Sequence, residues 1–100
     1  MTLPILPIYA YKLPSSGEIA RSVQAYVADR VEDLVKDLPK DPKLRVSTTP
    51  IDDYTQVMIF ASREEIKTLI EENTEQINQE LRAMGIRTAF YVKIAWTGVS

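Results

Sequence analysis

The chain has 100 residues, of which 45% are hydrophobic and 26% are charged, and its formal net charge is −2. These values are typical of one globular domain over 1–100 and exclude disordered, collagen-like and coiled-coil chains. Cysteine and histidine are absent, which excludes disulfides, thiolate or Ser-His-Asp catalysis, and zinc sites built from these residues. We therefore expect a cytoplasmic protein with no cofactor, and since no apolar run reaches about 18 residues, no membrane partner.

The first part of the chain predicts a strand and a helix. Residues 1–14 are apolar, rich in tyrosine and punctuated by proline, which indicates a strand or, failing that, a free N-terminal arm. Ser15 and Glu18 have the spacing of a capping box. Apolar residues then recur at helical intervals until Pro39, so we predict a helix over 16–38.

The middle of the chain predicts two strands. Residues 44–49 alternate between apolar and polar side chains, as the residues of a half-buried strand do. Residues 54–61 are apolar at most positions, which is typical of a central strand. The connection at 50–53 contains proline and aspartate, residues that favour tight turns. These two strands are therefore expected to form an antiparallel hairpin.

The last part predicts a helix and a strand. Ser62, followed three residues later by a glutamate, repeats the capping-box spacing and predicts a helix over 62–84. Gly85 follows at the position where a left-handed C-cap is expected. Residues 86–96 alternate regularly between large apolar and other side chains, which predicts a strand.

This order of elements predicts an α+β protein with a ferredoxin-like βαββαβ fold, a four-stranded antiparallel sheet with both helices on one face. Right-handed crossovers would place the strand from 1–14 inside that sheet. If residues 1–14 form an arm, the remaining order is αββαβ, which is KH-like.

One short segment carries a resemblance to a known family. Asp41-Pro42-Lys43-Leu44 follows the first predicted helix and precedes two strands and a helix. In this respect the chain resembles ribosome-binding factor A. That family has a KH-like fold and binds ribosomal RNA, so the resemblance implies the αββαβ order and RNA as a partner.

Charge is distributed unevenly among the predicted elements. The helix over 16–38 has five carboxylates and three cations, and the helix over 62–84 has six and three, giving net charges of −2 and −3. The predicted strands contain no acidic residue, and their cations are Lys12, Arg45, Arg87 and Lys93. We therefore expect a bipolar molecule with an acidic helical side and a basic sheet side.

Alternation along the strands assigns side chains to the face of the sheet that no helix covers. Large aliphatic side chains are expected beneath the helices, which leaves tyrosines, other large side chains and cations on the other face. This predicted face consists of Tyr9, Tyr11, Arg45, Met58, Phe60, Arg87, Tyr91 and Lys93. Because a monomer rarely exposes so much apolar surface, we expect another molecule to cover it.

Two functions fit such a face. The first is a non-catalytic protein-binding or assembly module that self-associates as a homo-oligomer or docks a protein partner. The alternative is binding of single-stranded RNA, with bases stacked on the rings and phosphates beside the cations. Residues 54–61 lack the pattern of RNA-recognition motifs. No nucleophile elbow or phosphate loop is present either, so we expect no enzyme.

Overall fold

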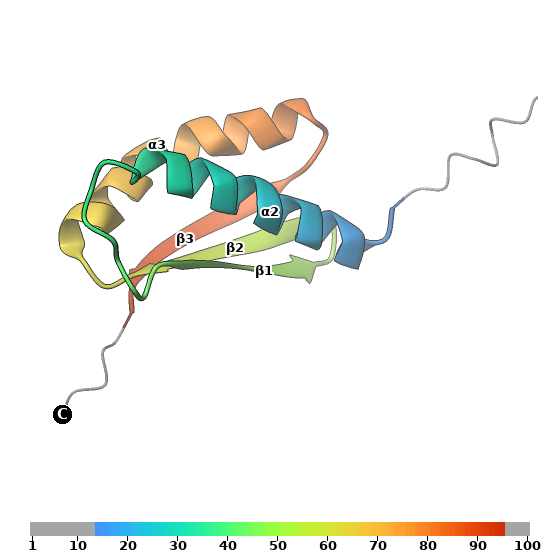
Figure 1. The fold of residues 1–100 in the computed structure, drawn as a ribbon. Helices are drawn as coiled ribbons and strands as arrows, with labels where there is room; N and C mark the ends of the chain where they lie inside the picture. Colours follow the sequence, from blue (N-terminus) through green and yellow to red (C-terminus); the bar gives the residue numbers. More distant parts are fainter. Residues whose placement is uncertain (1–13, 96–100) are drawn as a thin grey trace, which may run out of the picture.

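The computed structural model describes residues 14–95, which form two helices and a three-stranded mixed sheet (Figure 1). In chain order the elements are α2 (Ser16–Leu34), β1 (Arg45–Ile51), β2 (Tyr54–Ala61), α3 (Glu64–Ala83) and β3 (Thr88–Ile94). The predicted α+β class is thus confirmed. Neither described helix combines the length and hydropathy that a membrane span requires.

The sheet has the order β1-β2-β3, and its pairing corrects part of the prediction. β1 and β2 are antiparallel, as expected, but β2 and β3 are parallel and directly paired, from Thr55 with Thr88 to Ala61 with Ile94. A ferredoxin-like sheet would insert the strand from 1–14 between these two, so that order is not confirmed. Residues 1–13 lie outside the described residues, and the described order is αββαβ.

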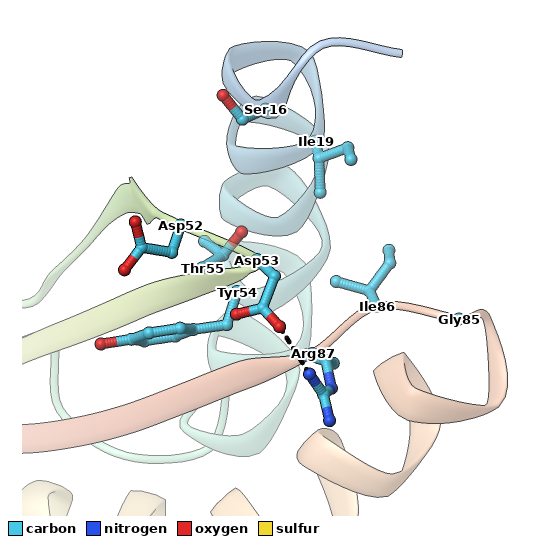
Figure 2. Close-up of a pocket in the computed structure, with 9 residues that line it drawn as sticks. All are labelled: Ser16, Ile19, Asp52, Asp53, Tyr54, Thr55, Gly85, Ile86 and Arg87. Carbon is cyan, nitrogen blue, oxygen red and sulfur yellow. Dashed lines mark hydrogen bonds and ion pairs between the residues drawn. The ribbon is translucent and has the colours of Figure 1, made fainter. Parts of the chain in front are cut away.

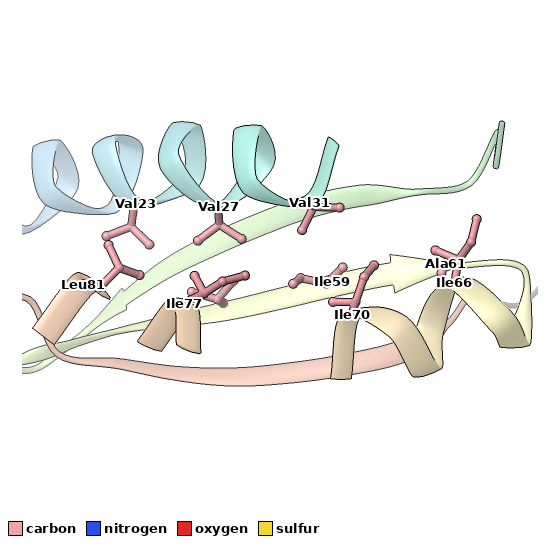
Figure 3. Packing of buried hydrophobic residues seen from close by; sticks show 10 residues of the cluster. Val23, Val27, Val31, Ile59, Ala61, Ile66, Ile70, Ile77 and Leu81 are labelled. Carbon is pink, nitrogen blue, oxygen red and sulfur yellow. The ribbon is translucent and has the colours of Figure 1, made fainter. Parts of the chain in front are cut away.

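The core lies between the two helices and the inward face of β2 (Figure 3). Alternate residues of β2 point into it, because successive side chains of a strand face opposite sides. The helices contribute residues spaced three, four or seven apart, which form one stripe on each helix. The buried cluster consists of Val23, Val27, Val31, Val57, Ile59, Ala61, Ile66, Ile70, Ile77 and Leu81.

α2 begins and ends close to the predicted residues. Ser15 and Glu18 form the expected capping box, with the Glu18 amide donating to the Ser15 hydroxyl at 3.1 Å. The helix ends at Leu34, four residues before the predicted end. Val35 is its C-cap, and Pro39, which restricts only the backbone of Leu38, lies beyond this end.

α3 begins with a different cap from the predicted one. Its N-cap residue is Arg63, whose side chain makes no capping hydrogen bond. Asp41 serves instead: its carboxylate accepts the Ser62 amide at 2.8 Å, the Arg63 amide at 3.3 Å and the Ser62 hydroxyl at 2.5 Å. A residue from the connection between α2 and β1 therefore holds the two residues that lead into α3, a contact that no local spacing reveals.

α3 ends as predicted. Gly85 has a φ of +83°, the left-handed conformation that glycine adopts without strain. Its amide donates to the Arg82 carbonyl at 2.9 Å, and the Ile86 amide donates to the Leu81 carbonyl at 3.0 Å. These bonds satisfy carbonyls that the end of the helix would leave free and turn the chain toward β3.

Glu80 joins the two helices. Arg30 of α2 donates two hydrogen bonds of 2.9 Å, one to each carboxylate oxygen of Glu80, and the Tyr26 hydroxyl donates to Oε1. Hydrogen bonds from Arg30 and then Tyr26 hold the pKa of Glu80 at about 2, below the ordinary 4.5. The charged form of Glu80 is thus favoured in the folded state.

This shift makes stability depend on pH. A pKa lowered by folding stabilises the fold fully above the ordinary 4.5 and less as the pH falls toward about 2. We expect Glu80→Gln to lower Tm at pH 7 and the difference from the unchanged protein to shrink between pH 5 and pH 3. Thermal unfolding followed by circular dichroism at pH 7, 5, 4 and 3 measures this. A difference in Tm that stays constant over this range would contradict the role of Glu80.

Candidate functional site

One face of the sheet has no helix over it within the described residues (Figure 1). On β2 the residues that face the core are buried, whereas the alternate residues, which point the other way, are only half-buried. The same alternation applies to the two neighbouring strands. We call the resulting surface the open face, made of Arg45, Ser47, Thr49, Ile51, Tyr54, Gln56, Met58, Phe60, Ala89, Tyr91 and Lys93.

The strand register places two cations on either side of an aromatic ring. Arg45 of β1 and Lys93 of β3 both lie beside Phe60 of β2, so the three residues form one row across the sheet. The guanidinium carbon of Arg45 lies 5.2 Å from the centre of the Phe60 ring, which is the distance of a cation–π contact. This end of the open face is therefore positively charged.

The next row is apolar at its centre. Met58 lies between Ser47 and Tyr91, and the Tyr91 side chain is 45% exposed. The row beyond it contains only small or uncharged side chains, namely Thr49, Gln56 and Ala89. The open face thus changes from cationic at one end to apolar and then to neutral polar.

The structure brings together five of the predicted site residues, Arg45, Met58, Phe60, Tyr91 and Lys93. Arg87 is not among them. It precedes β3 at the other end of the sheet, where its guanidinium is paired with Asp53 at 2.7 Å. Tyr9 and Tyr11 lie outside the described residues.

The observed helices and strands differ in charge as predicted. Arg45 and Lys93 are the charged residues of the three described strands. α2 contains four carboxylates and two cations, and α3 contains six and two, so their net charges are −2 and −4. The helical layer is acidic and the open face is basic.

A hollow lies at the cationic end of the open face and includes a residue that the sequence analysis missed. Lys43 lines it from the connection between α2 and β1, and its amide donates to the Asp41 carboxylate at 3.0 Å. No hydrophobic periodicity covers that connection, so alternation could not assign Lys43 to a face of the sheet. We call this the cationic hollow, lined by Pro42, Lys43, Leu44, Arg45, Phe60, Lys93, Ile94 and Ala95.

Figure 2 shows a second pocket, at the opposite end of the sheet, between the start of α2 and the turns on either side. The ion pair between Arg87 and Asp53 lies at its edge, and both side chains are largely exposed. Arg87 and Asp53 thus neutralise each other, whereas Asp52, which also lines this pocket, is in none of the ion pairs between described residues. In residues 14–95 no group of three or more carboxylates is placed to hold a metal ion.

The chain matches no known protein family, no curated protein and no solved structure. The resemblance to ribosome-binding factor A therefore remains a likeness of Asp41-Pro42-Lys43-Leu44 and of the order of elements. The function has to be inferred from geometry and charge.

Proposed function

We propose that the protein is a non-catalytic binding module that docks a protein partner through the open face. One observation carries this proposal: Met58, Phe60 and Tyr91 form an apolar centre with cations at one end and no acidic residue on any described strand. Protein interfaces have an apolar centre enriched in aromatic residues and methionine, with a polar rim. Such aromatic residues supply most of the binding energy.

The partner we infer is a different protein with carboxylates on its surface. Two copies of this chain stacked sheet on sheet would bring one cationic face against another. The carboxylates of a second copy lie on its helices, so the sheet of one copy would have to bind the helices of the next. Such a head-to-tail contact repeats from copy to copy and gives a filament unless the copies close into a ring. Mass in solution, measured by sedimentation at increasing concentration, tests this choice, since a discrete dimer would contradict it.

A photo-crosslinking amino acid tests the docking surface. Placed at Tyr91 or Gln56 on the open face, it is expected to give one discrete adduct of the same partner in cells that produce the full chain. Placed at Ser22 of α2 or Glu72 of α3, both exposed on the helical layer, it is expected to give none. Adducts that form equally from both layers, or from the helices alone, would contradict the proposal. Adducts with RNA from the open face would favour single-stranded RNA instead.

A further inference from the structure

We infer that the cationic hollow is a subsite for carboxylate groups, so that the docked partner presents aspartate or glutamate beside an apolar side chain. This inference rests on the proposed function and specifies the chemistry of the partner. Three cations, Lys43, Arg45 and Lys93, line the hollow together with apolar side chains. It therefore suits a ligand with a negative group on an apolar body.

The charges of the hollow are available to a ligand. None of the ion pairs between described residues includes Lys43, Arg45 or Lys93. By contrast, Arg30, Arg63 and Arg87 each hold a carboxylate. An acidic group that enters the hollow would therefore not have to break an existing ion pair to bind these cations.

Asp41 is close in sequence to Lys43 and Arg45, but its carboxylate does not neutralise the cations of the hollow. Its side chain is buried, and its carboxylate oxygens accept hydrogen bonds from Lys43 in the same connection and from Ser62 and Arg63, which lead into α3. Burial raises the pKa of Asp41, but these hydrogen bonds outweigh burial and the net shift is downward. Asp41 thus stays charged and turned inward, and it also fixes the backbone of Lys43.

Arg45 is oriented for recognition before a ligand arrives. Its guanidinium lies over the Phe60 ring, which restricts the rotamers of a long side chain. A guanidinium held in place binds a carboxylate through two parallel hydrogen bonds, with less loss of entropy than a free lysine would incur. The Phe60 ring beneath the guanidinium supplies the apolar contact of the hollow.

The arrangement favours a carboxylate of a protein over a nucleic-acid backbone. A nucleic acid repeats its charge along the strand and binds along a continuous cationic groove. Here the cations without an ion pair lie at one end and the next two rows are uncharged. Arg87 at the far end is already paired with Asp53, and the helices behind the sheet have net charges of −2 and −4. In addition, Arg45 already lies on the face of Phe60 that a base would need for stacking.

Binding of short probes to the purified full-length protein, followed by NMR, tests the subsite. The probe is a blocked pentapeptide with two glutamates flanking a phenylalanine, and its control carries glutamines in their place. We expect the glutamate peptide to shift the amide signals of Arg45, Phe60 and Lys93, and the glutamine peptide to bind at least about fivefold more weakly. Arg45→Met and Lys93→Met are each expected to weaken binding about three- to tenfold, whereas the matched control Arg87→Met leaves it unchanged.

The outcomes separate this inference from the proposed function. Equal binding of the two peptides, or loss of binding in Arg87→Met, would overturn the carboxylate subsite. If crosslinks from Tyr91 persist while neither peptide binds, the subsite is wrong and the docking face remains. If both fail, both proposals are wrong. Octauridine that shifts the same signals at lower concentration than the glutamate peptide would overturn the subsite in favour of RNA.

Discussion

Replacing Asp41 by alanine is expected to lower the free energy of unfolding by about 3 kcal/mol. Each buried donor left without a partner costs about 1–3 kcal/mol, and hydrogen bonds to a charged group are stronger than those to a neutral one. In this protein the carboxylate accepts from the amides of Ser62, Arg63 and Lys43 and from one hydroxyl. Urea denaturation followed by circular dichroism measures the change.

Two control variants separate the cap from a general effect of charge. Asp41→Asn keeps one oxygen acceptor but loses the charge, so we expect about half the destabilisation of the alanine variant. Asp37→Asn removes an exposed carboxylate of the same connection and is expected to change the free energy by less than about 0.5 kcal/mol. If Asp41→Ala were no more destabilising than Asp37→Asn, the role of Asp41 as the cap of α3 would be wrong.

The second large effect is expected in the core. Ile59 is fully buried in the middle of β2, beneath both helices (Figure 3). Replacing a buried isoleucine by alanine costs about 2–5 kcal/mol, because apolar contacts are lost and a cavity remains. Since Ile59 lies beneath both helices, we expect Ile59→Ala to lower the free energy of unfolding, measured by urea denaturation, by about 4 kcal/mol.

Ile94 provides the matched control for Ile59. It is the same residue type in the same sheet, but it is 41% exposed at the end of β3. Ile94→Ala is expected to cost about 1 kcal/mol or less, because less apolar area leaves the water on folding. Similar losses from the two substitutions would contradict the placement of the core between the helices and β2.

Periodicity was enough to predict most elements of the fold but not the partners of the strands. β2 was predicted with the observed ends, and α3 ends just before the left-handed Gly85 as expected, because these signals are local. Strand neighbours depend on contacts between residues far apart in the chain, and alternation contains no information about them. For this reason the direct parallel pairing of β2 with β3 was not foreseen.

The candidate site was predictable to the extent that it follows from alternation. Met58, Phe60 and Tyr91 lie on the open face because each is one residue removed from a core position. Lys43 belongs to an irregular connection, and its place in the cationic hollow depends on the long-range cap by Asp41. The pairing of Arg87 with Asp53 likewise joins two turns that only the folded chain brings together.

Oxidation of methionine tests whether a partner covers the open face, because the chain contains its own control. Met58 lies in the middle of the open face, and Met84 is 54% exposed at the end of α3, away from the core. Two samples are treated with dilute hydrogen peroxide: the protein in a gently prepared low-salt lysate of its own cells, and the purified protein. The sulfoxide formed at each methionine is then quantified by mass spectrometry. We expect Met58 to be oxidised much more slowly in the lysate than in the purified protein, whereas Met84 is oxidised at the same rate in both, each rate being taken relative to a free peptide standard. Equal protection of both residues, or protection of Met84 alone, would contradict this expectation.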